Sequence, residues 1–136
     1  EKMSTCQMAV PLIRPDPTQH HQFVFGLWAT RTIKKKWKSK DGSHDSLIAS
    51  VPMPVVAFLR LGDLAISKSA MANCFVSSAV KCQDHSFFSN VNINQKPQLN
   101  SGSIEAVWVC PEGRTDEKLN DIFSVYNLRG DARIYK

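Results

Sequence analysis

The feature that most constrains the fold is a period-two alternation that begins at Phe23. One set of alternate residues includes Phe23, Phe25 and Leu27 and continues to Trp37. The residues between them change from apolar side chains to threonines and lysines. Successive side chains of a β-strand point to opposite faces of the sheet, so this pattern predicts a strand. Further strands are predicted for residues 55–61, for the segment from Cys74 and for residues 104–110, with a tight turn at residues 62–63. The sequence therefore predicts a mostly β fold, an antiparallel sandwich or barrel-like arrangement, with α+β as the second choice.

One helix is predicted near the C-terminus. Thr115 is a suitable N-cap, and acidic residues follow it in the first turn, where the helix dipole favours negative charge. Gly130 is suited to end this helix. The apolar face of the predicted helix consists of Leu119, Ile122, Phe123 and Tyr126.

The chain length of 136 residues fits one domain. Residues 1–22 are predicted to form an extended, proline-containing arm, because proline is disfavoured in helix interiors and central strands. Residues 23–136 are predicted to form a single β-rich domain. The apolar residues of the arm suit a groove on a neighbouring copy, although packing against their own chain is the alternative. The predicted self-association residues are Met8, Val10, Leu12 and Ile13.

Positive charge is concentrated in one segment of the chain. The formal net charge is +5, and residues 31–40 contain six basic residues and no acid. Alternating lysines beside a tryptophan are typical of polyanion-binding surfaces, so the predicted partner is nucleic acid or an anionic membrane surface. The alternative is a solvated edge strand, on which lysines prevent aggregation. The predicted polyanion-binding residues are Arg31, Lys34, Lys35, Lys36, Trp37, Lys38 and Lys40.

The four cysteines, Cys6, Cys74, Cys82 and Cys110, favour free thiols in a reducing compartment, with two disulfides as the open alternative. No nucleophile-elbow, glycine-rich phosphate-loop or zinc-protease pattern was recognised. The sequence therefore predicts no catalytic residue, no metal site and no small-molecule cofactor.

These observations lead to a non-enzymatic structural or assembly protein as the first hypothesis. A small, basic, β-rich chain with an extended arm is typical in composition of viral coat and matrix proteins, and such a protein would form homo-oligomers. An intracellular or virion-associated location is favoured over secretion, because no signal peptide is visible at the first residues. Two alternatives stay open: an extracellular recognition domain with disulfides, and an enzyme whose site is assembled from separated residues. The tripeptide at residues 129–131, Arg-Gly-Asp, would suit integrin recognition if it were exposed.

Overall fold

A five-stranded mixed sheet organises the chain, with the spatial order β2-β1-β6-β7-β5. The computed structural model describes residues 9–19, 22–63, 65–80, 87–88, 101–111 and 121–135. Neighbouring strands are antiparallel except for β5 and β7, which run parallel. The strands of this sheet are β1 (Val10–Pro15), β2 (Phe23–Phe25), β5 (Val55–Phe58), β6 (Ile104–Val109) and β7 (Phe123–Leu128).

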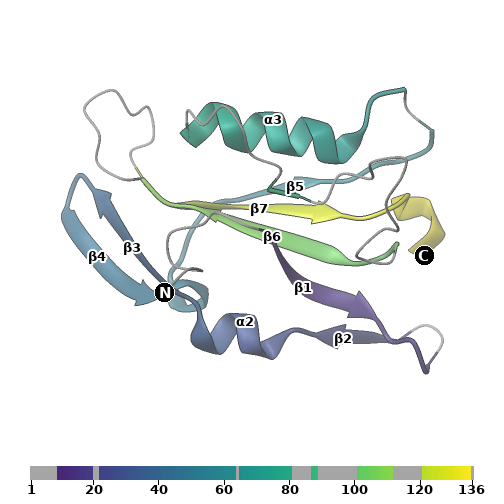
Figure 1. Cartoon of the computed structure of the whole chain (residues 1–136), viewed down its shortest axis with the longest axis horizontal. Helices are drawn as coiled ribbons and strands as arrows, with labels where there is room; N and C mark the ends of the chain where they lie inside the picture. The colour runs from purple at the N-terminus through teal and green to yellow at the C-terminus, as the bar shows by residue number, and fades with distance from the viewer. Residues whose placement is uncertain are drawn as a thin grey trace.

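The helix α3 (Lys68–Val80) lies across one face of the sheet, as Figure 1 shows. Ala72 and Val76 of α3 pack against apolar side chains of β6 and β7. Asn73 extends this contact: its side chain accepts a hydrogen bond from the backbone N–H of Phe88 and donates one to the Phe88 carbonyl. The core on this face consists of Ala72, Val76, Phe87, Phe88, Val107, Val109 and Val125.

A second core lies on the opposite face of the sheet. It receives side chains from the hairpin of β3 (Lys34–Ser39) and β4 (Gly42–Leu47), from the residue that follows the short helix α2 (Leu27–Thr32), and from the 3-10 turn η1 (Ile48–Ser50). The second core consists of Val10, Ile33, Trp37, Ile48, Ala106, Trp108, Cys110 and Ile122.

A last 3-10 turn, η2 (Ala132–Tyr135), follows β7. Within the described residues, none of the helices combines the length and the hydrophobicity of a membrane-spanning segment.

The strand β6 is buried on both faces. Val107 and Val109 contact the α3 side, whereas Ala106 and Trp108 belong to the opposite core. Burial on both faces explains why residues 104–110 are apolar almost without interruption. The predicted strand in this segment is confirmed, and so is the mostly β fold class with an α+β arrangement.

The long helix lies elsewhere than predicted. The apolar residues Ile122, Phe123 and Tyr126 have helical spacing, but residues 123–128 form β7, so the prediction of a helix there was wrong. The predicted strand from Cys74 was also wrong, because this segment is part of α3. Gly62 does not form a tight hairpin; it lies in the loop that joins β5 to α3. Residues 112–120, which include the predicted cap Thr115, lie outside the described residues.

The structure places part of the predicted arm in the sheet. Residues 10–15 form β1 between β2 and β6, although prolines were expected to exclude them from such a position. A register shift between Pro11 and Ile13 allows the β1–β6 ladder to include Pro11, which has no N–H to donate.

The predicted continuous strand after Phe23 is interrupted by α2. Gly26 accounts for the break: its N–H donates to the carbonyl of Leu12 at 2.7 Å, and a Cβ at this position would lie 2.8 Å from the Pro11 carbonyl oxygen. Only glycine fits so close to the neighbouring strand.

Candidate functional site

The loop between β5 and α3 carries a distinctive run of residues. Residues 62–69 read Gly-Asp-Leu-Ala-Ile-Ser-Lys-Ser, and α3 begins at Lys68. Gly62 has a φ of 96°, a conformation that favours glycine. Its N–H donates to a carboxylate oxygen of Asp131 at 3.1 Å, which ties the loop to the segment after β7. The loop therefore lies at the carboxyl ends of two parallel strands, where sheets of this kind bind ligands.

Lys68 lies at the centre of a buried polar cluster. Its ammonium group donates to Asn127 Oδ1 at 2.9 Å and to the backbone carbonyl of Leu128. The Asn127 amide nitrogen lies 3.1 Å from Ser69 Oγ and 3.3 Å from Glu105 Oε2. Arg129 Nη1 lies 3.8 Å from the same Glu105 oxygen. The cluster consists of Lys68, Ser69, Glu105, Asn127 and Arg129, and it is named the Lys68 cluster below.

The strand register explains why these residues meet. Glu105 of β6 lies opposite Asn127 of β7. Each lies two positions from a valine that faces α3, Val107 or Val125, so both polar side chains also face α3. Polar residues thus replace apolar ones on the α3 face where β7 ends. Because the first turn of α3 covers this end, Lys68 and Glu105 are only 9% and 2% exposed.

Positive charge exceeds negative charge around the loop. Among the described residues, Arg60, Lys68, Arg129 and Arg133 surround it, with Glu105 and Asp131 as the buried carboxylates and Asp63 exposed to solvent. Burial lowers the pKa of Lys68 to about 8, and repulsion from Arg60 and Arg129 contributes, while Glu105 acts in the opposite direction. These four cations outnumber the three carboxylates by one charge, and a local excess of positive charge favours an anionic ligand.

Asp131 does not offset the charge of Lys68, because it is paired elsewhere. Its carboxylate accepts a hydrogen bond from the Arg133 guanidinium at 2.7 Å, and this contact lowers the pKa of Asp131 to about 2. Arg129 and Asp131 are 8% and 6% exposed. The arginine and aspartate of the Arg-Gly-Asp tripeptide are therefore buried, and this burial does not fit the exposed loop that integrin recognition would need.

Two buried polar atoms near the cluster have no hydrogen-bond partner within the described part of the chain. One is Nε of Arg60, which follows β5 after one intervening residue, and the other is the hydroxyl of Ser103. Ser103 directly precedes β6, and strand alternation places it on the same face as Glu105. Buried polar groups are normally paired, so unsatisfied groups beside a cation cluster point to a ligand that would complete them.

The arrangement resembles a phosphate-binding P-loop. In that motif a strand is followed by Gly-x-x-x-x-Gly-Lys-Ser/Thr and then by a helix, whose backbone N–H groups and lysine contact phosphates. This chain has the strand, the first glycine, the lysine, the following serine and the helix in the same order, with Ser67 in place of the second glycine. The Ser67 hydroxyl accepts a hydrogen bond from the Ala70 N–H at 3.4 Å. The site therefore departs from the motif at the residue that normally gives phosphate close access to the backbone.

Two features hide this site in the sequence. Ser67 interrupts the glycine pattern of the motif, and the strand predicted from Cys74 stood in place of the helix that the motif requires. The spacing of Gly62 to the pair Lys68-Ser69, immediately after an apolar strand, was the signal that would have found it.

The predicted polyanion-binding residues are divided between two environments. Lys34, Lys36 and Lys38 are exposed along one face of β3, and Lys36 forms an exposed ion pair with Asp45 at 3.6 Å. Lys35 and Trp37 are buried, and Trp37 stacks on His44 with ring centroids 5.1 Å apart. Arg31 lies in the last turn of α2 and Lys40 in the β3–β4 turn, both exposed. The lysine face exists, but Trp37 is not available to stack on a ligand, and polyanion binding stays a prediction.

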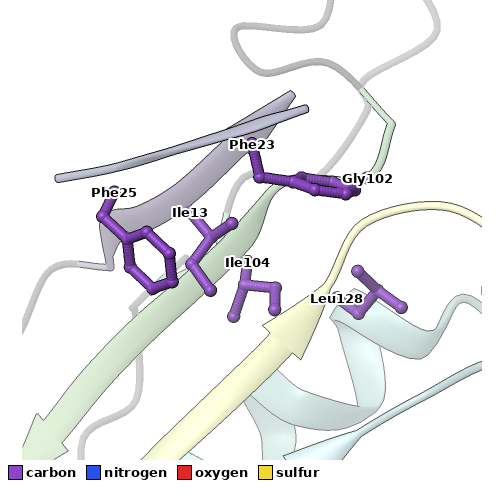
Figure 2. Close-up of a pocket in the computed structure, with 6 residues that line it drawn as sticks. All are labelled: Ile13, Phe23, Phe25, Gly102, Ile104 and Leu128. Atoms are coloured by element: carbon purple, nitrogen blue, oxygen red, sulfur yellow. The ribbon is translucent and has the colours of Figure 1, made fainter. Parts of the chain in front are cut away.

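Three of the residues predicted to self-associate, Val10, Leu12 and Ile13, lie in β1. Val10 is in the core and Leu12 packs against it. Ile13 lines an apolar pocket of about 300 Å³, shown in Figure 2. Met8 lies outside the described residues, and self-association stays a prediction.

That apolar pocket is a weaker candidate than the Lys68 cluster. It lies on the other face of the sheet, because Ile104 and Leu128 have the opposite parity to Glu105 and Asn127. The side chains in Figure 2 are all apolar, whereas binding sites for small molecules normally combine apolar walls with a few polar groups that orient the ligand. Its lining is Ile13, Phe23, Phe25, Gly102, Ile104 and Leu128.

The thiols show no sign of a shared site within the described residues. Cys74 and Cys110 are free, and burial raises the pKa of the Cys110 thiol to about 11. A raised pKa makes a thiol unreactive at neutral pH. Cys6 and Cys82 lie outside the described residues.

Comparison with known proteins identifies relatives over the whole chain. The family model described as "Up-regulator of cell proliferation-like domain" matches residues 1–136. The chain is 33% identical to human interferon-induced very large GTPase 1, with 97% of the chain and 6% of that protein covered. It is 38% identical to bovine up-regulator of cell proliferation, covering 96% of the chain and 15% of that protein. Human caspase recruitment domain-containing protein 6 is 29% identical over 98% of the chain and 14% of its own length. No solved structure matches.

These relatives correct the functional hypothesis. They include an interferon-induced GTPase and an up-regulator of cell proliferation, and the chain spans 6% to 15% of the length of the relatives described above. The hypothesis of a viral coat- or matrix-like assembly protein was therefore wrong, since its support was composition alone. The match of one family model to all 136 residues shows that the chain belongs to the up-regulator of cell proliferation-like domain family.

Proposed function

We propose that this domain binds the phosphate groups of a nucleotide at the loop between β5 and α3, without hydrolysing them. The observation that carries the proposal is Lys68, a buried lysine in the first turn of α3 that takes the lysine position of a modified P-loop. One of the relatives described above is named as a GTPase, which favours a nucleotide over other phosphate compounds.

The proposed binding requires Lys68 to exchange partners. Its ammonium group now donates to Asn127 and to the Leu128 carbonyl, and its long flexible stem allows it to turn toward the loop. A phosphate there would also meet the positive end of α3 and the charges of Arg60 and Arg129. The unsatisfied Arg60 Nε and Ser103 hydroxyl would gain an anionic partner.

The proposal of a non-catalytic domain rests on two departures from the motif. Ser67 brings a side chain into the position where glycine normally allows the phosphates close access, so binding should be weaker than in a complete P-loop. Asn127 stands beside Ser69 where P-loop enzymes have an aspartate that holds Mg²⁺. An uncharged amide at that position cannot support the usual metal-assisted phosphoryl transfer.

Isothermal titration calorimetry with GTP, ATP and inorganic triphosphate tests the proposal. Lys68→Gln should weaken binding roughly 10- to 100-fold, because a charge-assisted hydrogen bond contributes about 1.5–3 kcal/mol. Lys68→Arg keeps the charge and should retain more affinity than Lys68→Gln. Ser67→Gly restores the motif and should strengthen binding.

Arg14→Gln is the control, because it removes one positive charge from an exposed position of β1 that is not among the predicted polyanion-binding residues. Circular dichroism and thermal melting establish whether each variant is folded. The three ligands separate the sources of binding: equal affinities would indicate recognition of the phosphates alone, and a preference for GTP would add recognition of the base. Absence of binding to all three ligands by the wild-type domain, or equal binding by a folded Lys68→Gln variant, would refute the proposal.

A further inference from the structure

The residues beside Lys68 do not fit a magnesium ion. In P-loop proteins the serine or threonine after the lysine and an aspartate on a neighbouring strand hold Mg²⁺. Ser69 and Asn127 take these positions here. Magnesium requires oxygen ligands in octahedral geometry and favours carboxylates, whereas the Asn127 side chain carries no charge.

The orientation of the Asn127 amide is fixed by its partners. The Lys68 ammonium can only donate hydrogen bonds, so the Asn127 atom 2.9 Å from it must be the carbonyl oxygen. The amide nitrogen therefore points toward Ser69 Oγ at 3.1 Å and Glu105 Oε2 at 3.3 Å. An N–H donor thus occupies the place between these oxygens where a cation would otherwise bind.

The acidic residues nearby do not supply an alternative metal site. Glu105 lies 3.8 Å from Arg129, and Asp131 is paired with Arg133. Within the parts of the chain that the structure describes, no group of three or more histidine, cysteine, aspartate and glutamate residues could hold a metal ion. Positive charge at this site comes from Lys68, Arg60 and Arg129.

We propose that polyphosphate binds at the Lys68 cluster without Mg²⁺, with protein cations taking the role that the metal has in P-loop enzymes. This inference rests on the proposed function. Because Mg²⁺ neutralises part of the ligand charge in solution, it should weaken binding to a site whose attraction is to the free anion. The domain would then select metal-free polyphosphate over its magnesium complex.

The decisive experiment is calorimetry of the wild-type domain with inorganic triphosphate, in excess EDTA and in excess Mg²⁺. We expect binding in EDTA and a several-fold larger dissociation constant in Mg²⁺. Binding only in Mg²⁺ would overturn metal independence and leave the proposed function intact. Absence of binding in both buffers would refute the proposed function itself, and metal independence with it.

Ser69→Ala provides an independent test, because it removes the hydroxyl that would be a metal ligand. Without a metal, the variant should bind triphosphate no more than about tenfold more weakly, the upper value of one neutral hydrogen bond. The loss should also be equal in the two buffers. A much larger loss confined to the Mg²⁺ buffer would overturn the inference.

Asn127→Asp tests the same point in the opposite direction. A carboxylate next to Lys68 and Ser69 would repel phosphate and attract a divalent cation, so binding in EDTA should fall and Mg²⁺ should partly restore it. Circular dichroism establishes whether this buried variant folds. If it does not fold, the binding of triphosphate by the wild-type domain in EDTA and in Mg²⁺ decides whether the site is metal-independent. A folded Asn127→Asp variant that binds equally in both buffers would contradict the role assigned to the amide.

Discussion

The depressed pKa of Lys68 predicts that the domain becomes more stable as pH rises above neutrality. In the unfolded chain this lysine titrates near its ordinary value of 10.5, whereas in the folded domain its pKa is about 8. Between these two values the unfolded chain binds more protons than the folded one. The free energy of unfolding must therefore increase with pH across this window. Below pH 8 Lys68 is charged in both states, and the folded domain carries the full cost of burying this charge beside Arg60 and Arg129. The cost decreases as the pH rises from 8 to 10.5, and it is absent once Lys68 is neutral in both states.

The size of the effect follows from the two pKa values. Raising the pH from about 7 to about 10 should increase the free energy of unfolding by about 1–2.5 kcal/mol, where the lower figure allows for screening by solvent at the edge of the sheet. Urea denaturation at a series of pH values measures this slope. Lys68→Met keeps an unbranched stem without a titrating group, so the difference between wild type and variant isolates the contribution of Lys68.

Lys36→Met serves as the control for this experiment, since Lys36 is exposed on β3 and should leave the wild-type slope unchanged. If wild type and Lys68→Met gain stability in parallel between pH 7 and 10, the ammonium group of Lys68 is not buried as the structure indicates. The account of the Lys68 cluster as a buried cationic site would then be refuted.

Two further predictions concern the framework that positions the cluster. Val125 is fully buried under α3, so Val125→Ala should reduce the free energy of unfolding by about 1.5–3 kcal/mol. Met71→Ala, on the exposed side of α3, should change it by less than about 0.5 kcal/mol in the same urea titration. Gly62→Ala should reduce the free energy of unfolding by about 1–2 kcal/mol, because alanine is strained at the positive φ of this position. The added Cβ itself would make only an ordinary 3.5 Å contact with Arg133. A neutral Gly62→Ala variant would show that the loop does not hold this conformation in solution.

The strand β6 was predictable from sequence, because burial on both faces leaves an almost continuous apolar run. The helix α3 was not, since two properties hide it. Its buried positions include Asn73, whose side chain bonds the backbone of Phe88 and interrupts the apolar stripe. The pairs Phe75-Val76 and Ala79-Val80 favour a strand by composition, although tertiary packing makes them helical.

The opposite error occurred at β7. Ile122, Phe123 and Tyr126 match a helical face by coincidence, while in the strand Phe123 and Val125 point toward α3 and Tyr126 packs on the other core. The strand also carries buried polar residues, Ser124 and Asn127, which conceal its alternation. Asn127 is part of the Lys68 cluster, so the residue that made the strand difficult to recognise belongs to the candidate site.

The parallel pairing of β5 with β7 has a consequence for how the domain acquires its shape. Lys68 and Asn127 are 59 residues apart in the chain, and β1 meets β6 across a still longer separation. The β3–β4 hairpin needs only local contacts and can form early, whereas the β5–β7 ladder must first close a long loop at an entropic cost. During synthesis on the ribosome, the Lys68 side chain therefore has no Asn127 amide partner until β7 emerges. Assembly of the charged cluster should be among the last events of folding, and a chain truncated before β7 would leave Lys68 in water.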